Sequence, residues 1–264
     1  MATAIDSDSF QNLSSSQYAA AHGTRKRLFW IKADIDDEEY FSYLIRLLTV
    51  QISSEYNSYQ IQEVPPELPH EMVELAETMR DEAYHGIGLA RILRELGVDP
   101  EPIRRDAMFG SRKKVLGIFL VPMETYVHVA CLRWLGERVG GYQSIAVHGC
   151  SYVPYAVWSA RNYLDEGRTH SYHGRDVLVR FIKQGRRDEV QKIAELYYPH
   201  ALDMFGGNNT PNELAYLKHG IKTWRNNDLR RIWIETIAAD WDMLGLVKPN
   251  NMWKGIRHDY YDSE

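Results

Sequence analysis

Four long segments of this sequence each carry a glutamate inside an otherwise apolar helical stripe. Apolar residues recur at steps of three and four along residues 37–59, 69–96, 116 to beyond 139, and 154–182, as on one face of an α-helix. The glutamates in these stripes are Glu55, Glu82, Glu137 and Glu166. Burying an ionised carboxylate costs several kcal/mol unless something compensates its charge, so these residues constrain both the fold and its chemistry.

The spacing of the glutamates indicates that they lie at one depth in a bundle. Nearly the same number of residues separates Glu55 from Glu82 as separates Glu137 from Glu166. In an antiparallel helix pair with a short loop, two such residues lie level, each about 12 residues and about 18 Å from the turn. One buried glutamate is explained by a salt bridge, but a set of them at one depth favours a shared cation.

Histidines occur at the spacing that completes a metal site. His85 follows Glu82 by three residues, so the two share a helix face. Bundles that bind two metal ions take a glutamate from each of two helices and a Glu-x-x-His pair from each of the other two. After Glu166 the spacing is longer, because His170 comes four residues later and His173 seven, both on the same face. A single-turn π-bulge is one way to absorb the extra residue.

These patterns predict an all-α, ferritin-like four-helix bundle, with additional C-terminal helices over 187–204, 211–224 and 226–245. Residues 1–24 are rich in Ser, Ala, Gln and Asp and predict a flexible N-terminal arm, and residues 25–264 predict a single ferritin-like helical domain. Carboxylates with two imidazoles suit iron or manganese. The ordinary alternatives are a surface ion pair of Glu137 with Arg133 or Arg138, and helix-end polar contacts for His170 and His173.

The composition excludes several classes of function. The formal net charge is −5 with acidic and basic residues interleaved, so we expect no nucleic-acid partner. The longest apolar run, residues 115–122, is far shorter than the ~20 residues that cross a bilayer, so we expect no membrane association. The start lacks the pattern of a secretory signal, which predicts a cytoplasmic protein.

Further motifs resemble a known family. The segments that carry the resemblance are DEAYHG at 81–86, SYVPYA at 151–156, PHALDMFG at 199–206, NNDLR at 226–230 and MLG at 243–245. In this order they resemble the catalytic-subunit family of the bacterial phenylacetyl-coenzyme A epoxidase, which comprises ferritin-like di-iron monooxygenases. The resemblance extends over roughly residues 40 to 250.

The resemblance implies the ligands of two iron ions. They are Glu55, Glu82, His85, Glu137 and Glu166, with His170 as the sixth and His173 as its alternative. This sequence departs from the family at two of these positions. The family has an aspartate where Glu137 stands, and its second pair has the three-residue spacing, whereas Glu166 and His170 are four residues apart. The family's chain also extends further at its C-terminal end.

The resemblance also implies a reaction and its partners. Two iron ions activate dioxygen as co-substrate, an external NAD(P)H-dependent reductase supplies electrons, and one oxygen atom enters the substrate while the other leaves as water. The substrate is an aromatic or other acyl group, possibly a coenzyme A thioester, and Lys114, Lys222 and Asn226 are its expected binding residues. The protein partner is a ferritin-like subunit or a second copy of the chain.

Other functions compete with a monooxygenase. One is a non-catalytic structural subunit of a multicomponent oxygenase, against which the retention of four stripe glutamates and His85 argues. Others are a ferritin-like di-iron oxidase, such as an N-oxygenase or an acyl-carrier-linked oxidase, and a ferritin-type protein that stores iron. The sequence leaves open whether the acyl group is bound to coenzyme A, bound to a carrier protein or free.

Overall fold

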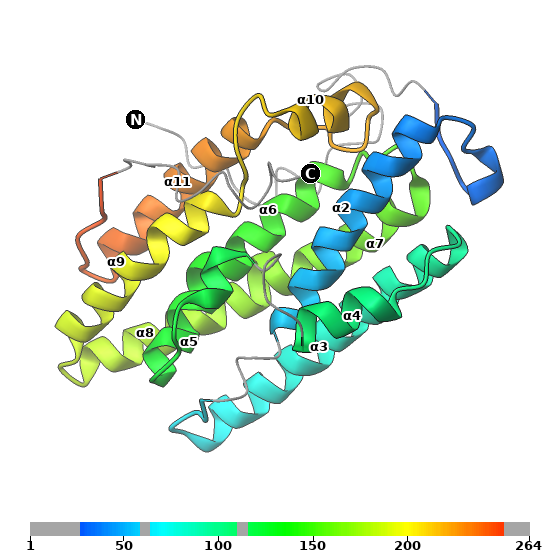
Figure 1. Cartoon of the computed structure of the whole chain (residues 1–264). Helices are drawn as coiled ribbons and strands as arrows, with labels where there is room; N and C mark the ends of the chain where they lie inside the picture. The colour runs from blue at the N-terminus through cyan, green and yellow to red at the C-terminus, as the bar shows by residue number, and fades with distance from the viewer. Residues whose placement is uncertain (1–26, 59–63, 110–115, 251–264) are drawn as a thin grey trace.

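The computed structural model describes residues 27–58, 64–109 and 116–250. Four long helical rods pack side by side (Figure 1). The rods are α2 (Glu38–Asn57), α3 (Pro69–Glu95), α5–η5–α6 (Tyr126–Cys131, Leu132–Glu137, Arg138–Val147) and α7–η6–α8 (Val153–Leu164, Asp165–His170, Ser171–Lys183). Among the described residues, extended pairing is limited to an isolated bridge between Phe29 and Tyr152. The all-α, ferritin-like bundle expected from the sequence is therefore confirmed.

Capping residues, a proline and a glycine set the ends of the first two rods. The Asp37 carboxylate accepts the Tyr40 backbone N–H at 3.0 Å and caps α2. Pro69 occupies the first position of α3, where its fixed φ suits a helix and its missing N–H costs nothing. Beyond α3, Gly97 takes a φ of +82°, which a glycine adopts easily and which ends the helix. The predicted segment reached Tyr59, which lies outside the described residues.

The third rod begins later than we predicted. A helix was expected from about residue 116, but residues there form the short 3₁₀ helix η4 (Gly117–Leu120), and α5 starts at Tyr126. Pro122 lies between the two, and its ring and missing N–H prevent a continuous helix. Further along, the rod widens into the π-helical segment η5 before it continues as α6.

The fourth rod confirms the predicted helix over 154–182 and adds detail to it. It begins at Val153 with a proline in its first turn and ends at Lys183. Its middle, Asp165–His170, is the π-helical segment η6. The π-bulge suggested by the spacing of Glu166 and His170 is thus present.

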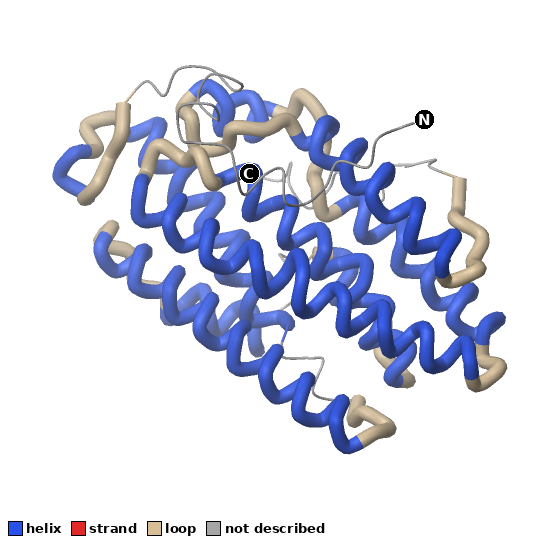
Figure 2. The backbone as a smooth tube through the Cα atoms, turned by 180° about the vertical axis from the view of Figure 1, so that it is seen from behind, coloured by secondary structure: helices blue, strands red, loops and turns tan. Residues whose placement is uncertain are grey.

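Further helices pack against the outside of the bundle. They are α4 (Glu101–Phe109), α9 (Arg187–Asp203), α10 (Pro211–Lys218) and α11 (Asn226–Met243). Helix α4 packs against α2, and α9 packs against the third and fourth rods. Helix α4 was not among the helices expected from the sequence. A proline is tolerated in a first helical turn, and Pro102 occupies this position in α4. We also expected α10 to reach residue 224, whereas the chain turns at Gly220 with a φ of +65°. Figure 2 shows from behind that the described loops lie at the ends of the helices.

The buried apolar residues form two clusters that leave a polar layer between them. Along α3, Leu75 belongs to the first cluster and Leu89 to the second. Along the fourth rod, Trp158 belongs to the second cluster and Val177 to the first. The predicted metal ligands of both rods lie between these positions in the sequence. None of the described helices is long and apolar enough to cross a membrane.

Candidate metal centre

The structure brings together all six residues predicted as metal ligands. Glu55 is on α2, Glu82 and His85 are on α3, Glu137 ends η5, and Glu166 and His170 are in η6. At most 10% of any of these side chains is exposed. The six side chains come from all four rods, with Glu55 near the C-terminal end of α2 and the others from the interior of their rods, so the complete bundle is needed to assemble the cluster.

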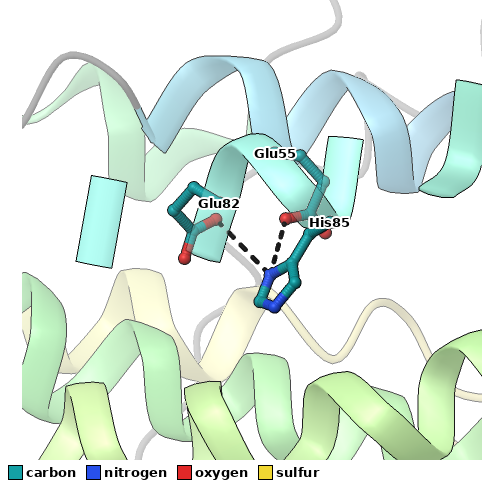
Figure 3. Close-up of side chains that lie close together, drawn as sticks. All are labelled: Glu55, Glu82 and His85. Carbon is teal, nitrogen blue, oxygen red and sulfur yellow. Dashed lines mark ion pairs between the residues drawn. The ribbon is translucent and has the colours of Figure 1, made fainter. Parts of the chain in front are cut away.

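The first half of the cluster surrounds His85 (Figure 3). The His85 Nδ1 atom lies 3.5 Å from Glu55 Oε2 and 3.9 Å from Glu82 Oε2. The Glu166 Oε1 atom is 3.6 Å from the same nitrogen. Figure 3 shows the Glu55 and Glu82 carboxylates facing this nitrogen. A single cation between them would be within reach of one imidazole nitrogen and of carboxylate oxygens from two rods.

The second half of the cluster surrounds His170. Its Nδ1 atom lies 3.3 Å from Glu82 Oε1 and 3.8 Å from Glu137 Oε2. Glu82 therefore presents one carboxylate oxygen to His85 and the other to His170. A carboxylate with this placement can bridge two metal ions, one in each half.

Two aspartates hold the outer edges of the histidine rings in a crossed arrangement. The Asp165 carboxylate lies 3.3 Å from His85 Nε2, and the Asp81 carboxylate lies 3.4 Å from His170 Nε2. Each aspartate precedes the glutamate of one rod and contacts the histidine of the other. A carboxylate that accepts the Nε2 proton leaves Nδ1 free to bind a metal and raises its basicity.

The π-helical segment η6 explains how a histidine four residues after Glu166 reaches the cluster. A π-turn is wider than an α-turn, so it accommodates one extra residue while the helix on either side keeps its face. His170 then enters the cluster. His173 lies about one turn further along α8, where burial lowers the pKa of its imidazole. The charge of Glu74 opposes this shift, and that of Arg133 adds to it. The structure therefore places His170 and not His173 beside the carboxylates.

Glycines let the third and fourth rods approach each other at this depth. A methyl group on Gly141 would lie 2.5 Å from the Cα atom of Gly167, so the backbones are already in contact. A methyl group on Gly140 would overlap the Glu166 carboxylate. Larger residues at these positions would push η6, and with it Glu166, out of the cluster.

The pKa values show that the cluster holds protons when no cation is bound. Burial and the charge of Glu137 raise the pKa of Glu82 to about 8, and burial raises that of Glu166 well above its usual range. Burial favours neutral imidazoles, yet Asp165 and Glu55 raise the pKa of His85 to about 12. The pKa of His170 is likewise raised, to about 10. Metal ions that displace these protons would relieve the repulsion between the carboxylates.

The donor set fits two iron ions. His85 Nδ1, His170 Nδ1 and Glu82 Oε1 are buried and make no hydrogen bond within the described chain. Buried polar atoms without partners are costly, and both nitrogens face the Glu82 carboxylate, at 3.9 Å from His85 and 3.3 Å from His170. Four carboxylates with two imidazoles form the mainly hard donor set that suits iron or manganese and that carboxylate-bridged di-metal bundles use.

One cavity lies at the cluster and a second lies beside it. An inner cavity of about 40 Å³ touches Glu55, Glu82, Glu137 and Glu166. An outer cavity of about 150 Å³ lies further from the metal ligands and includes Lys222 in its wall. Most of its remaining lining comes from α2, α6, α10 and the segments that flank α10, and Leu116 and the ends of α9 and α11 also contribute. The two cavities share lining residues, so a space large enough for an organic molecule lies next to the cluster.

The residues expected to bind substrate divide into two groups. Lys222 and Asn226 line the outer cavity, and the Lys222 ammonium donates hydrogen bonds to Gln143 Oε1 at 3.0 Å and to Asn226 Oδ1 at 3.4 Å. Burial lowers the pKa of Lys222 to about 8. Lys114 lies outside the described residues.

Sequence reasoning missed two polar residues that contact the ligands. Gln51 donates its side-chain N–H to Glu55 Oε1 at 2.9 Å, and Ser58 donates its hydroxyl to Glu82 Oε2 at 3.2 Å. Gln51 precedes Glu55 by one helical turn, so the i,i+4 spacing could have revealed it. Ser58 reaches across to another rod, and no local pattern indicates such a contact.

Comparison with known proteins supports this architecture. The model of a family described as phenylacetic acid catabolic protein matches residues 34–263. The chain belongs to this family. It is also 29% identical over 193 residues to a subunit of the 1,2-phenylacetyl-CoA epoxidase of Escherichia coli strain K12, an alignment that covers 70% of this chain. The chain spans 60% of the length of that relative. The family resemblance that the sequence motifs indicated is therefore confirmed.

Proposed function

We propose that this member of the phenylacetic acid catabolic protein family is a di-iron, dioxygen-dependent monooxygenase. The observation that carries the proposal is Glu82, whose two carboxylate oxygens face the Nδ1 atoms of two different histidines. One iron ion would be held by Glu55, Glu82 and His85, and the other by Glu82, Glu137 and His170. Glu166 would complete the first site through its contact with His85. When bound, the iron pair would supply reductive activation of dioxygen and transfer of one oxygen atom.

The protein residues have the tasks of orienting the ligands and excluding water. Asp81 and Asp165 fix the imidazole rings with Nδ1 towards the metal positions. Ser58 holds one oxygen of Glu82. Phe119 and Leu132 add apolar surface to an inner cavity that is otherwise lined largely by carboxylates, and its small volume limits the water beside the proposed metal positions.

The outer cavity is the proposed binding site of an aromatic or other acyl substrate, possibly a coenzyme A thioester. The buried Lys222 ammonium and the Asn226 amide would bind an acyl carbonyl or the polar end of the substrate. Epoxidation or hydroxylation of the apolar end would then take place next to the inner cavity. The name of the Escherichia coli relative, which refers to a phenylacetyl-CoA epoxidase, supports an aryl thioester.

The same relative is one component of a larger enzyme by its name, which supports assembly with further chains. We propose that this chain works with a ferritin-like partner subunit or a second copy of itself, and that an NAD(P)H-dependent reductase supplies its electrons. The proposed location is the cytoplasm, where such a reductase would meet its cofactor. A purely structural subunit would have no use for six converging ligands, which favours the catalytic role.

Iron loading tests the proposal. Full-length apoprotein is loaded with Fe²⁺ anaerobically, its metal content is measured, and an oxygen pulse is followed by optical absorption. We expect two iron ions per chain, one for each donor set, and an absorption change after the pulse. Glu82→Ala should lose at least one iron while its circular dichroism stays helical. Glu77→Ala, at an exposed position of the same helix, should load as the wild type does. Equal iron content in both variants would refute the proposed centre.

A further inference from the structure

The outer and inner cavities are separated by the residues that line both of them, which we call the neck. These residues are Gln51, Ser54, Gly140 and Met204. A molecule that moves from the outer cavity into the inner one along the shortest route has to pass or displace these four residues. The width of the neck therefore limits the size of the molecules that reach the proposed metal centre.

The sizes of the two cavities show why the neck matters. The outer cavity measures about 150 Å³, and cavities of about this volume in other proteins hold a benzene ring. The inner cavity measures about 40 Å³, and a water needs about 10–15 Å³ of such volume, so only a few water-sized molecules fit there. An aromatic ring can occupy the outer cavity but must displace a neck side chain to place an edge beside the metal ligands.

Gln51 is the neck residue that can move and that also contacts a proposed metal ligand. Gly140 has no side chain, and Ser54 has a short one. Met204 is flexible but is not in the cluster. Gln51 combines a long flexible side chain with the hydrogen bond from its Nε2 to Glu55 Oε1 at 2.9 Å.

We propose that Gln51 is a gate that determines which substrates reach the centre and couples their arrival to Glu55. The proposal deepens the proposed monooxygenase function and rests on it. In the closed position the amide narrows the neck and holds one oxygen of Glu55. When an aromatic ring pushes the amide aside, the neck widens and Glu55 Oε1 loses its donor. Glu55 is then free to change its coordination only when substrate is present, so Gln51 acts as a positioning residue as well as a size filter.

Access kinetics test the gate. Azide and catechol both give coloured complexes with ferric iron, but azide is small and catechol carries a ring. We expect Gln51→Ala, in iron-loaded full-length protein, to raise the association rate of catechol about tenfold, because the ring no longer has to displace the amide. Azide, which passes the neck without displacing it, should associate at the wild-type rate. Gln184→Met, at an exposed position just after the fourth rod, is the control for a glutamine change elsewhere.

The coupling to Glu55 has its own measurement. Gln51→Met keeps the length of the side chain but removes the donor. In protein loaded with Co²⁺, the visible absorption of the metal reports its coordination. We expect phenylacetate to shift this spectrum in the wild type, and Gln51→Met to show the shifted spectrum without phenylacetate. A spectrum unchanged by Gln51→Met would refute the coupling.

The outcomes separate the gate from the function on which it rests. Equal catechol rates in wild type and Gln51→Ala, with iron bound in both, would overturn the gate and leave the proposed function intact. A rise in both azide and catechol rates would also overturn it, because the change would then be a general loosening. A wild-type chain that binds no iron would overturn the proposed function and the gate together.

Discussion

Asp81 and Asp165 each precede a proposed ligand in the sequence, yet each contacts the histidine of the other rod. The crossed contacts tie α3 to η6 at two points and fix both rings by their Nε2 atoms. The aspartates differ in exposure, since 19% of the Asp81 side chain and 41% of the Asp165 side chain are accessible. Both can therefore be replaced by asparagine without burying a new unpaired group, which allows their roles to be measured.

The crossed arrangement predicts that each aspartate affects the metal of the opposite rod. Asp165→Asn should weaken the ion held by His85, and Asp81→Asn the ion held by His170, each by about 10–100-fold, the usual cost of losing such an outer contact. Titration of the apoprotein with Co²⁺, followed optically, measures both affinities. Asp176→Asn, on the exposed face of α8, serves as the control. The hypothesis fails if either variant binds two ions with wild-type affinity.

The buried ammonium of Lys222 should make the free energy of unfolding increase with pH. Burial lowers the pKa of Lys222 from 10.5 in the unfolded chain to about 8 in the fold. Between these values the unfolded chain binds a proton that the folded chain does not, so this residue makes the fold more stable as the pH rises. At neutral pH the fold carries the cost of the buried charge.

The matching variant is Lys222→Met, which cannot titrate. Relative to this variant, the wild type should gain about 1.4 kcal/mol in its free energy of unfolding per pH unit across that window. Urea unfolding of both apoproteins at a series of pH values provides the test. Parallel stability curves would show that the Lys222 ammonium keeps its proton in the fold.

At the scale of elements, the π-helical segment η6 predicts the effect of a deletion. A π-bulge behaves as an α-helix with one inserted residue, so removal of a residue inside it should restore a regular helix. Deleting the exposed Thr169 places the histidine three residues after Glu166 and should keep both iron ions and the helical signal. Deleting the exposed Ala160 in α7 instead shifts the register of Glu166 and should abolish metal binding. Iron loss in the Thr169 deletion equal to that in the Ala160 deletion would contradict this account.

The elements that could be predicted from the sequence are those with long apolar periods and clear end signals. Helix α3 was predicted almost to the residue, because Pro69 and Gly97 bracket a stripe that holds Glu82. Helix α4 was missed because it is short and has a proline in its first turn. The start of α5 was predicted too early, because the apolar run over residues 115–122 resembles a helix interior. Pro122 ends that run and delays the helix to Tyr126.

The site was predicted where it depends on position along a helix, and missed where it depends on rotation between helices. The depth of Glu137 and Glu166 follows from counting residues along the third and fourth rods. For Glu55 the count was wrong, because this residue lies two residues before the end of α2 and not about 12 residues from a short turn. The crossing of Asp81 and Asp165 and the neck between the two cavities depend on how neighbouring rods are turned relative to each other. No periodicity within one segment contains that information.

At the scale of the whole molecule, α11 is fastened to the bundle by a buried ionic contact. Asp240 accepts the Trp134 indole N–H at 3.0 Å, forms an ion pair with Arg138, and lies 3.5 Å from Arg175. Arg138 directly follows Glu137, so the contact connects the C-terminal helices to the rod that carries a proposed ligand. The rings of Trp134 and Trp241 pack beside this contact, with their centroids 5.1 Å apart.

Breaking this contact should cost far more stability than a substitution on the surface of the same helix. Asp240→Ala leaves the buried Arg138 without its counter-charge and Trp134 without its acceptor, and removing one partner of a buried pair costs about 3–5 kcal/mol. Urea unfolding of the apoprotein should show that loss. Asp242→Ala, on the exposed face of α11, should unfold within about 0.5 kcal/mol of the wild type.

A double variant separates the two explanations of that loss. If the unpaired Arg138 is the main cost, Asp240→Leu combined with Arg138→Met should be more stable than Asp240→Leu alone, because no buried charge remains. If the loss comes instead from packing between α11 and the third rod, the second substitution should destabilise further. Iron content measured on the same proteins shows whether the effect extends to Glu137. We expect Asp240→Ala to weaken iron binding and the double variant to restore it, since Arg138 would no longer be drawn towards the carboxylates of the centre.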